Sequence, residues 1–347
     1  MHTLSVFINS INGQSPTNDK SKRIDSQFAI YRDRLPRDKV YVEAYTDATS
    51  PYSAMLNTSM KYMEEGNEQV AVVNVHRPGS LLAIDESAYL CDLYAYTYPS
   101  FTVNRAYFPG DAHIAYDMND YLAVSTELCG NILSDIAMQD LATPCFASIN
   151  LEGKYDETTR QLTVTAKGEM LPEAEAIYGD IALTLLVTED NVKSRQTVYN
   201  QTTGRTTTSQ NYLHPHVLRG YLTSPIGSPI ETDGTDYSAQ FSTTLDAGWN
   251  ADNLTVVALL TKAVEAVTDD NLFDMDVLNA TSLTMAQLKE QGNPVELIMA
   301  DQETPSPICY DLAGRTLVNS RSTGSNQPRG IYLVPQKGGA VRKVMVR

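Results

Sequence analysis

The chain has 347 residues, 42% of them hydrophobic, and its 42 acidic and 26 basic residues give a formal net charge of −16 at pH 7. The length predicts two or three domains, and the acidic balance excludes the basic surface that nucleic acids or anionic membranes require. No apolar run approaches the ~20 residues of a transmembrane helix, so no transmembrane span is expected.

The N-terminal segment is short, partly apolar and then polar. In residues 1–14 an apolar piece, Leu4 to Ile8, is followed by small and polar residues. This pattern resembles the end of a secretory signal peptide, so residues 1–14 are interpreted as a signal-peptide remnant. A frayed N-terminal tail is the alternative. Residues 15–39 are polar, carry mixed charge and are expected to form a lead-in.

Residues 40–144 alternate between strand and helix patterns. Strands are predicted at 40–46, 69–77 and 98–108, and helices at 53–66, 83–96 and 121–138. The run at 69–77 is nearly continuous Val and Ala, which is typical of a strand buried on both faces. These elements predict an α/β domain.

From residue 145 the pattern becomes all-β. A hairpin is predicted over 146–168, and further strands at 181–190, 216–224, 237–246 and 254–262. Their alternation and spacing predict an antiparallel β-sandwich over residues 145–300. A Pro-rich linker, 301–307, precedes a compact unit of short strands at 308–347.

The turn between the first strand and helix of the α/β domain reads Ser50-Pro51-Tyr52-Ser53. Thioredoxin-like folds usually carry Cys-x-x-Cys here, because the helix N-terminus lowers the pKa of the first thiol. Serine forms no disulfide, so dithiol–disulfide exchange is excluded at this turn. Ser50 or Ser53 is expected to cap the helix. A serine nucleophile is the weaker alternative, because no G-x-S-x-G elbow occurs.

Tyr98-Pro99 lies where thioredoxin-like folds place a cis-proline, and this bond is expected to be cis although most X–Pro bonds are trans. In relatives this proline shapes a concave surface that holds an extended peptide. The sequence therefore indicates a retained architecture without its redox chemistry.

Histidines and cysteines supply only weak candidate sites. His214 and His216 would share one face of an extended strand as a weak metal-ligand pair, although Pro215 favours a bend with partly exposed rings. Free thiols are expected at Cys91, Cys129, Cys145 and Cys309, with a Cys129–Cys145 bridge left open. The acidic segments 244–253 and 268–276 do not match a calcium loop, and no nucleotide-binding motif occurs. No cofactor is expected.

Several segments resemble the 28-kilodalton outer-membrane protein family of Gram-negative bacteria. In order they read VEAYTDATSPYS, VNVHRPG, YPSFTVNR, HPHVLRGYL and DMDVLNATSL, and they span roughly residues 40–300. The resemblance implies a thioredoxin-like module followed by a β-sandwich module. Many relatives keep a Trp-Cys-x-x-Cys turn, from which this chain departs at Ser50 and Ser53.

The last forty residues are similar to the C-terminal sorting domain of type IX secretion substrates. The matching positions are Tyr310, Asp311, Leu312, Gly314, Arg315, Pro328, Gly330, Ile331, Tyr332 and Lys343. The resemblance implies a small β-sandwich that directs passage across the outer membrane, with the type IX machinery as partner. A small β-domain without a sorting role is the alternative.

Together these features predict a multi-domain α/β plus all-β protein: a thioredoxin-like domain lacking its thiols, an antiparallel β-sandwich and a C-terminal sorting domain. The expected role is a non-enzymatic binding or adhesion protein, at the outer membrane or cell surface or secreted. Its partner would be an extracellular protein, peptide or glycan. The alternative is a periplasmic or surface protein that uses a thiol, such as Cys91 with His76 nearby, or a metal at His214 and His216.

Overall fold

The computed structural model describes residues 2–7, 10, 12, 14, 23–28, 30–107, 111–122, 124–200 and 202–291, and the strand residues 296–297, 309–310, 316–317, 330–335 and 341–346. The chain forms two compact units, Met1–Leu288 and Lys289–Arg347, each considered by itself.

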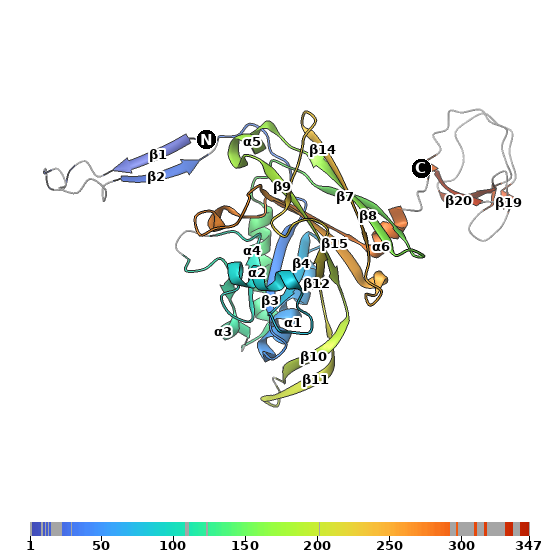
Figure 1. Ribbon diagram of the computed structural model, residues 1–347, viewed down its shortest axis with the longest axis horizontal. Helices are drawn as coiled ribbons and strands as arrows, with labels where there is room; N and C mark the ends of the chain where they lie inside the picture. Colours follow the sequence, from blue (N-terminus) through green and yellow to red (C-terminus); the bar gives the residue numbers. More distant parts are fainter. Residues whose placement is uncertain are drawn as a thin grey trace. The chain divides into compact units, whose positions relative to one another are not determined.

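A nine-stranded sheet is the centre of the first unit (Figure 1). Its strand order is β16-β15-β9-β12-β4-β3-β5-β6, with β13 also beside β9. The strands are β3 (Val40–Thr46), β4 (Val70–His76), β5 (Ser100–Val103), β6 (Tyr116–Asp117), β9 (Ile181–Glu189), β12 (Val217–Tyr221), β13 (Ser228–Pro229), β15 (Leu254–Lys262) and β16 (Asn279–Thr284). Strand β12 pairs parallel with β4 and antiparallel with β9. The ranges 40–144 and 145–300, expected as separate domains, therefore contribute strands to one sheet.

The described helices of the first unit are α1 (Pro51–Gly66), α2 (Asp85–Tyr94), α3 (Asn119–Leu122), α4 (Thr126–Leu141) and α5 (Pro172–Tyr178), and α6 (Met285–Gln291) begins in it. The single helix expected at 121–138 is instead two helices. Ser125 separates them, because its hydroxyl accepts the Leu128 N–H at 3.2 Å and caps α4. None of the helices in the described residues has the length and apolar composition needed to cross a membrane.

Both faces of the nine-stranded sheet are covered. In β3, Val40, Val42 and Ala44 pack with α1 and α4, whereas Tyr41 and Tyr45 pack on the other face with α2. Every residue of β9 is buried. One face of β9 and β15 packs against a second sheet in the order β14-β8-β7. This burial on two faces explains the nearly continuous apolar runs in the sequence.

The second sheet and two hairpins complete the first unit. Their strands are β7 (Asn150–Asp156), β8 (Gln161–Glu169), β14 (Asp236–Thr244), β10 (Val192–Asn200) with β11 (Arg205–His214), and β1 (His2–Phe7) with β2 (Arg23–Phe28). The hairpin expected over 146–168 is β7–β8. The segments interpreted as a signal remnant, 1–14, and a lead-in, 15–39, supply the paired strands β1 and β2; processing of this segment stays a prediction.

In the described residues of the second unit, five strands form one sheet, ordered β17-β21-β20-β18-β19. They are β17 (Glu296–Leu297), β18 (Cys309–Tyr310), β19 (Thr316–Leu317), β20 (Gly330–Pro335) and β21 (Val341–Val346). Of the expected sorting motif, Tyr310, Gly330, Ile331, Tyr332 and Lys343 lie on these strands. Asp311, Leu312, Gly314, Arg315, Pro328 and the linker 301–307 lie outside the described residues. The described strands make one sheet, where the sequence analysis expects a sandwich.

A buried ion pair holds the α2 side of the sheet together. Arg105 donates from Nε and Nη2 to the two carboxylate oxygens of Glu43, both at 2.8 Å. The hydroxyls of Tyr41 and Tyr45 donate to the same carboxylate at 2.8 and 2.6 Å. Burial alone would raise the pKa of Glu43, but Arg105 and the two hydroxyls lower it below its ordinary value. The carboxylate is therefore charged and fully partnered.

The backbone after β5 aims Arg105 at this carboxylate. Asn104 and Arg105 have φ values of 48° and 51°, the left-handed region that only a well-supported residue adopts. Asn104 supplies the support: its side-chain oxygen accepts the Tyr41 N–H at 2.8 Å, and its own N–H donates to the Tyr41 carbonyl at 2.7 Å. The turn after β5 is thus fastened to β3.

Replacing Arg105 with Met leaves a buried carboxylate without its cation. We expect Arg105→Met to lower the free energy of unfolding by about 3–5 kcal/mol, measured by urea denaturation. Lys61→Met is the control, because Lys61 pairs with Glu65 on the surface at 3.8 Å, and it should leave stability nearly unchanged. Equal stabilities for Arg105→Met and Lys61→Met would contradict this role for the ion pair.

Candidate functional site

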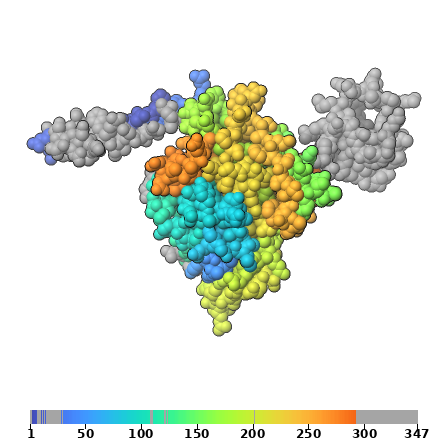
Figure 2. All heavy atoms as spheres, in the orientation of Figure 1, coloured from blue at the N-terminus to red at the C-terminus, as the bar shows by residue number. Residues whose placement is uncertain are grey.

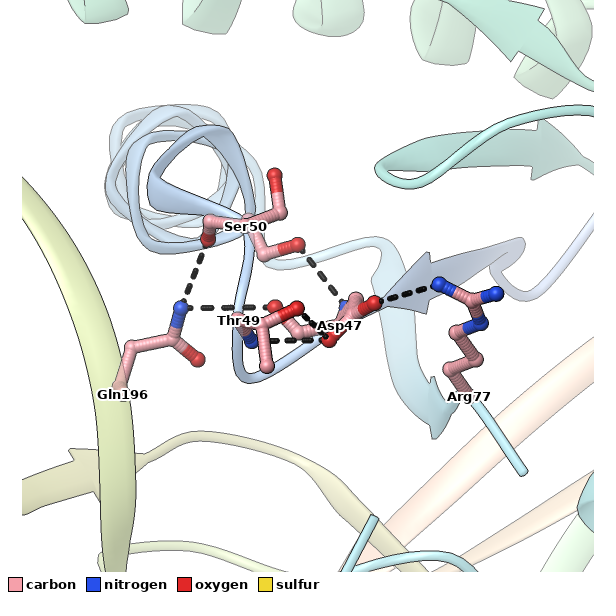
Figure 3. A network of polar contacts seen from close by, with 6 residues as sticks. Asp47, Thr49, Ser50, Arg77 and Gln196 are labelled. Atoms are coloured by element: carbon pink, nitrogen blue, oxygen red, sulfur yellow. Dashed lines mark hydrogen bonds and ion pairs between the residues drawn. The ribbon is translucent and has the colours of Figure 1, made fainter. Parts of the chain in front are cut away.

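The turn before α1 has an ordered polar structure but no side-chain cap on the helix (Figure 3). Ser50 occupies the N-cap position without a side-chain hydrogen bond, and Pro51 begins the helix. The hydroxyl of Ser53 accepts the Asp47 N–H at 3.0 Å. Ser50 is therefore the N-cap residue, as expected for one of the two serines, but neither side chain makes the expected capping hydrogen bond, because Ser53 is directed back to the loop. Ser53 is also fully buried, which removes it as a nucleophile.

Asp47 is the anionic centre of this turn. Its carboxylate accepts the N–H and the hydroxyl of Thr49, both at 2.8 Å, and a hydrogen bond from Arg77 at 2.9 Å. Burial favours the neutral acid, but the hydrogen bonds from Thr49 and Arg77 lower the pKa of Asp47 below its usual value. Asp47 therefore stays charged and fixes the loop between β3 and α1.

Arg77 links this turn to the Tyr98-Pro99 bond. That bond is cis, as predicted from the sequence. The Arg77 guanidinium lies 5.1 Å from the centre of the Tyr98 ring while it pairs with Asp47. The structure thus brings the thiol-free turn and the cis-proline together through one arginine. Tyr52 lies in the first turn of α1 and packs at the edge of the core below.

The β10–β11 hairpin covers the turn. Gln196 is 1% exposed, and its side-chain amide donates to the carbonyls of Ser50 at 2.8 Å and Asp47 at 3.5 Å. The Thr197 N–H donates to the Ala48 carbonyl at 2.8 Å. The carbonyls of Asp47, Ala48 and Ser50 are therefore partnered by a segment almost 150 residues further along the chain.

A second set of contacts holds the base of the hairpin. His216 Nε2 lies 3.0 Å from Glu64 on α1, and its Nδ1 lies 3.2 Å from Asp190. Burial opposes a charge on His216, but the Glu64 hydrogen bond and charge, with Asp190, raise its pKa above the ordinary value. Asn74 donates to the Pro215 carbonyl at 3.0 Å. The end of β11 is thus tied to α1 and β4.

Beneath the hairpin two histidine rings meet. His76 and His214 are both buried, with ring centres 5.2 Å apart in an edge-to-face arrangement. Burial, together with the neighbouring His214, lowers the pKa of His76 to about 3, and burial lowers the pKa of His214 to about 4. His76 Nε2 and both His214 nitrogens have no hydrogen-bond partner among the described residues. Both rings are therefore neutral packing groups at ordinary pH.

The expected metal pair is not assembled. His214 faces His76 whereas His216 faces Glu64 and Asp190, because His216 follows Pro215 with a φ of 50° that breaks the strand alternation. Among the described residues no group of three or more His, Cys, Asp or Glu side chains is arranged to hold a metal ion. In the acidic segment 244–253, Asp246 and Asn250 cap turns with their own side chains.

The cysteines supply no reactive thiol in the described part of the chain. Cys91, Cys129 and Cys145 are free and buried, so Cys129 and Cys145 do not form the bridge that the sequence left open. Burial raises the pKa of Cys91 to about 11, despite a hydrogen bond with Tyr98 that lowers it. A protonated, buried thiol is a poor nucleophile. The side chain of Cys309 lies outside the described residues.

The covering hairpin is the part of the candidate site that the sequence does not predict. Its strands are rich in Thr, Ser and Gln, so they show no apolar alternation for a core face. Gly204, which has a φ of 64° in the turn, is the local sequence signal that could have indicated a hairpin here. Nothing local indicates that Gln196 reaches Ser50, since that contact depends on the sheet.

The family whose sequence pattern is described as outer membrane protein Omp28 matches residues 86–272, more than half of the chain. The match crosses residue 144, as the shared sheet does. No curated protein matches the sequence.

Two solved structures are similar. HBP35 of Porphyromonas gingivalis has a TM-score of 0.57 at 16% identity, covering 91% of this chain and 100% of that chain, which indicates a shared fold. A domain of the outer membrane lipoprotein Omp28 from Porphyromonas gingivalis has a TM-score of 0.26 at 15% identity, covering 40% of this chain and 88% of that chain.

The buried histidines predict acid-sensitive stability. Below pH 6.5 the unfolded chain binds protons on these rings, whereas the folded rings bind them only near pH 3 and 4. The unfolded state thus holds more protons in this window, and stability falls as the pH drops through it. Between pH 6.5 and 4 the free energy of unfolding should fall by on the order of 3 kcal/mol less in His214→Leu than in the wild type, measured by urea denaturation.

The control for this experiment is His113→Leu. His113 is exposed and stacks on Tyr96. In His113→Leu the free energy of unfolding should therefore change with pH as it does in the wild type. A His214→Leu curve parallel to the wild type would show that this ring is not held neutral in the folded protein.

Proposed function

Because this chain belongs to the Omp28 outer membrane protein family, we propose that it is a non-enzymatic binding or adhesion protein with a redox-inactive thioredoxin-like unit. Its location at the outer membrane or cell surface follows from the family. The proposed partner is an extracellular protein, peptide or glycan, recognised at a surface other than the covered turn.

The sheet topology supports the thioredoxin-like part of this proposal. Strands β3 and β4 are parallel and joined through α1, whereas β5 and β6 are antiparallel to their neighbours, in the order β4-β3-β5-β6. A cis-proline precedes β5, and α1 begins directly after the turn that follows β3. The positions of the two thiols are occupied by Ser50 and Ser53.

The observation that carries the loss of redox function is the cover over that turn. A dithiol site needs two thiols and access for a polypeptide disulfide. Here Ser53 is fully buried, and Gln196 occupies the hydrogen-bonding positions beside Ser50. Restoring the thiols alone would leave the site closed.

The second unit supports export by its C-terminal region. Tyr310 of β18 pairs with Leu333 of β20, the residue after Tyr332, and Leu333 pairs with Lys343 of β21, so three strands that carry motif residues lie in one sheet. We propose that the type IX secretion machinery recognises this unit and that the protein then reaches the cell surface or the medium.

The double variant Ser50→Cys/Ser53→Cys tests the covered turn. We expect it to reduce insulin with dithiothreitol no faster than the wild type, because the hairpin excludes the substrate. Labelling with a thiol reagent should be fast for a control, Thr206→Cys, whose side chain is exposed on β11. The thiol introduced by Ser53→Cys should label only after unfolding. Rapid insulin reduction by the double variant would show that the turn is open to polypeptides.

Removal of residues 308–347 tests the sorting role. We expect the truncated protein to accumulate on the periplasmic side of the outer membrane of its native host. The full chain should reach the surface and be cleaved by protease added to intact cells. Location is measured by cell fractionation with the same protease treatment. Equal surface exposure of both proteins would contradict sorting by this unit, without bearing on the covered turn.

A further inference from the structure

The region around the covering hairpin has the opposite charge balance to the rest of the chain. From Asn191 to Ile230 the sequence contains four basic residues, Lys193, Arg195, Arg205 and Arg219, and no acidic residue. The whole chain carries −16. Of the four, Arg219 is largely buried and pairs with Glu189 at 2.8 Å. The other three are exposed on β10 and β11.

Two faces of the hairpin have different roles. Side chains alternate along β10, so Gln196 faces the α1 turn while Lys193, Arg195 and Tyr199 share the opposite face. The register places Thr206 opposite Tyr199 and Leu213 opposite Lys193. We call this set, with Thr197 and Thr208, the outer hairpin face. Arg205 lies at the tip beside it, and the hairpin projects from the body of the unit (Figure 2).

The composition of the outer hairpin face indicates what kind of partner it fits. Lys193 and Arg195 are exposed, and among the described residues no ion pair involves either of them or Arg205. Their charges are therefore available to an anionic partner. Threonines at 197, 206 and 208 supply hydroxyl donors and acceptors, and Tyr199 is 36% exposed.

We propose that the outer hairpin face binds an anionic polysaccharide. An aromatic ring packs on the apolar face of a sugar, hydroxyls match hydroxyls, and cations pair with the carboxylate or sulfate groups. A protein partner would call for a larger apolar centre than Tyr199 and Leu213 provide. A single-stranded nucleic acid would stack successive bases on several aromatic rings, whereas the outer hairpin face has one, Tyr199.

This inference rests on the proposed binding role and names its partner class. The geometry connects the two: Gln196 fixes the inner face of the hairpin against the turn, which leaves the outer face as the exposed side. Binding would therefore use the element that closes the redox position. A failure of polysaccharide binding would not reopen the turn, so the two proposals are tested separately.

The test measures binding of the full chain to fluorescein-labelled heparin oligosaccharide and polygalacturonate, with neutral dextran as the uncharged probe. We expect binding to both anionic polymers, weakening with salt, and none to dextran. The variant Lys193→Ser/Arg195→Ser/Arg205→Ser should bind about tenfold more weakly. The matched control, Lys61→Ser/Lys154→Ser/Lys167→Ser, removes three lysine charges that lie outside the hairpin and should bind as the wild type.

Tyr199→Ala separates polysaccharide recognition from simple attraction between charges. We expect it to weaken heparin binding severalfold and to leave any binding of inorganic polyphosphate unchanged. Equal affinity of the hairpin variant and its matched control would overturn the proposal. So would binding of polyphosphate, polyglutamate or single-stranded DNA as tight as that of heparin, with no effect of Tyr199→Ala. Urea denaturation of each variant confirms that it is folded.

Discussion

The pairing of β12 with both β4 and β9 is the constraint on which the rest of the structure depends. Val217 pairs with Asn74 near the carboxyl end of β4 and with Glu189 at the end of β9. The segment that connects β9 to β12 must therefore lie at the end of the sheet where β4 terminates. The α1 turn follows the carboxyl end of β3, which lies beside that of β4. Strand pairing alone thus brings the β10–β11 hairpin to the turn before α1.

Polar groups are buried on both faces of this sheet, with different consequences. On the α2 face Glu43 and Arg105 are charged, and tyrosine hydroxyls complete their hydrogen bonds. On the hairpin face His76 and His214 have lost their charge, because burial without a close carboxylate partner favours the neutral ring. A charge in the interior persists where its partners are complete, and a group that can neutralise does so where they are not.

Local patterns predicted the elements that bury apolar side chains. The β3 and β4 runs and the hairpin over 146–168 were readable because their periodicity reflects burial. The cis bond at Tyr98-Pro99 was predictable from its place in a family pattern. The shared sheet was not, since β12 reads as an ordinary strand whose partners are set by long-range pairing. The polar β10–β11 hairpin, which covers the turn before α1, has no apolar alternation that would indicate a core-facing side.

The most direct test of the covered turn is hydrogen–deuterium exchange at the Thr197 amide, which donates to Ala48 in the closed structure. The structure predicts slow exchange for this amide in the native protein and much faster exchange in Gln196→Ala, with the β3 amides unchanged. Fast exchange of Thr197 in the native protein would mean that the hairpin does not rest on the turn. The turn before α1 would then be open in solution.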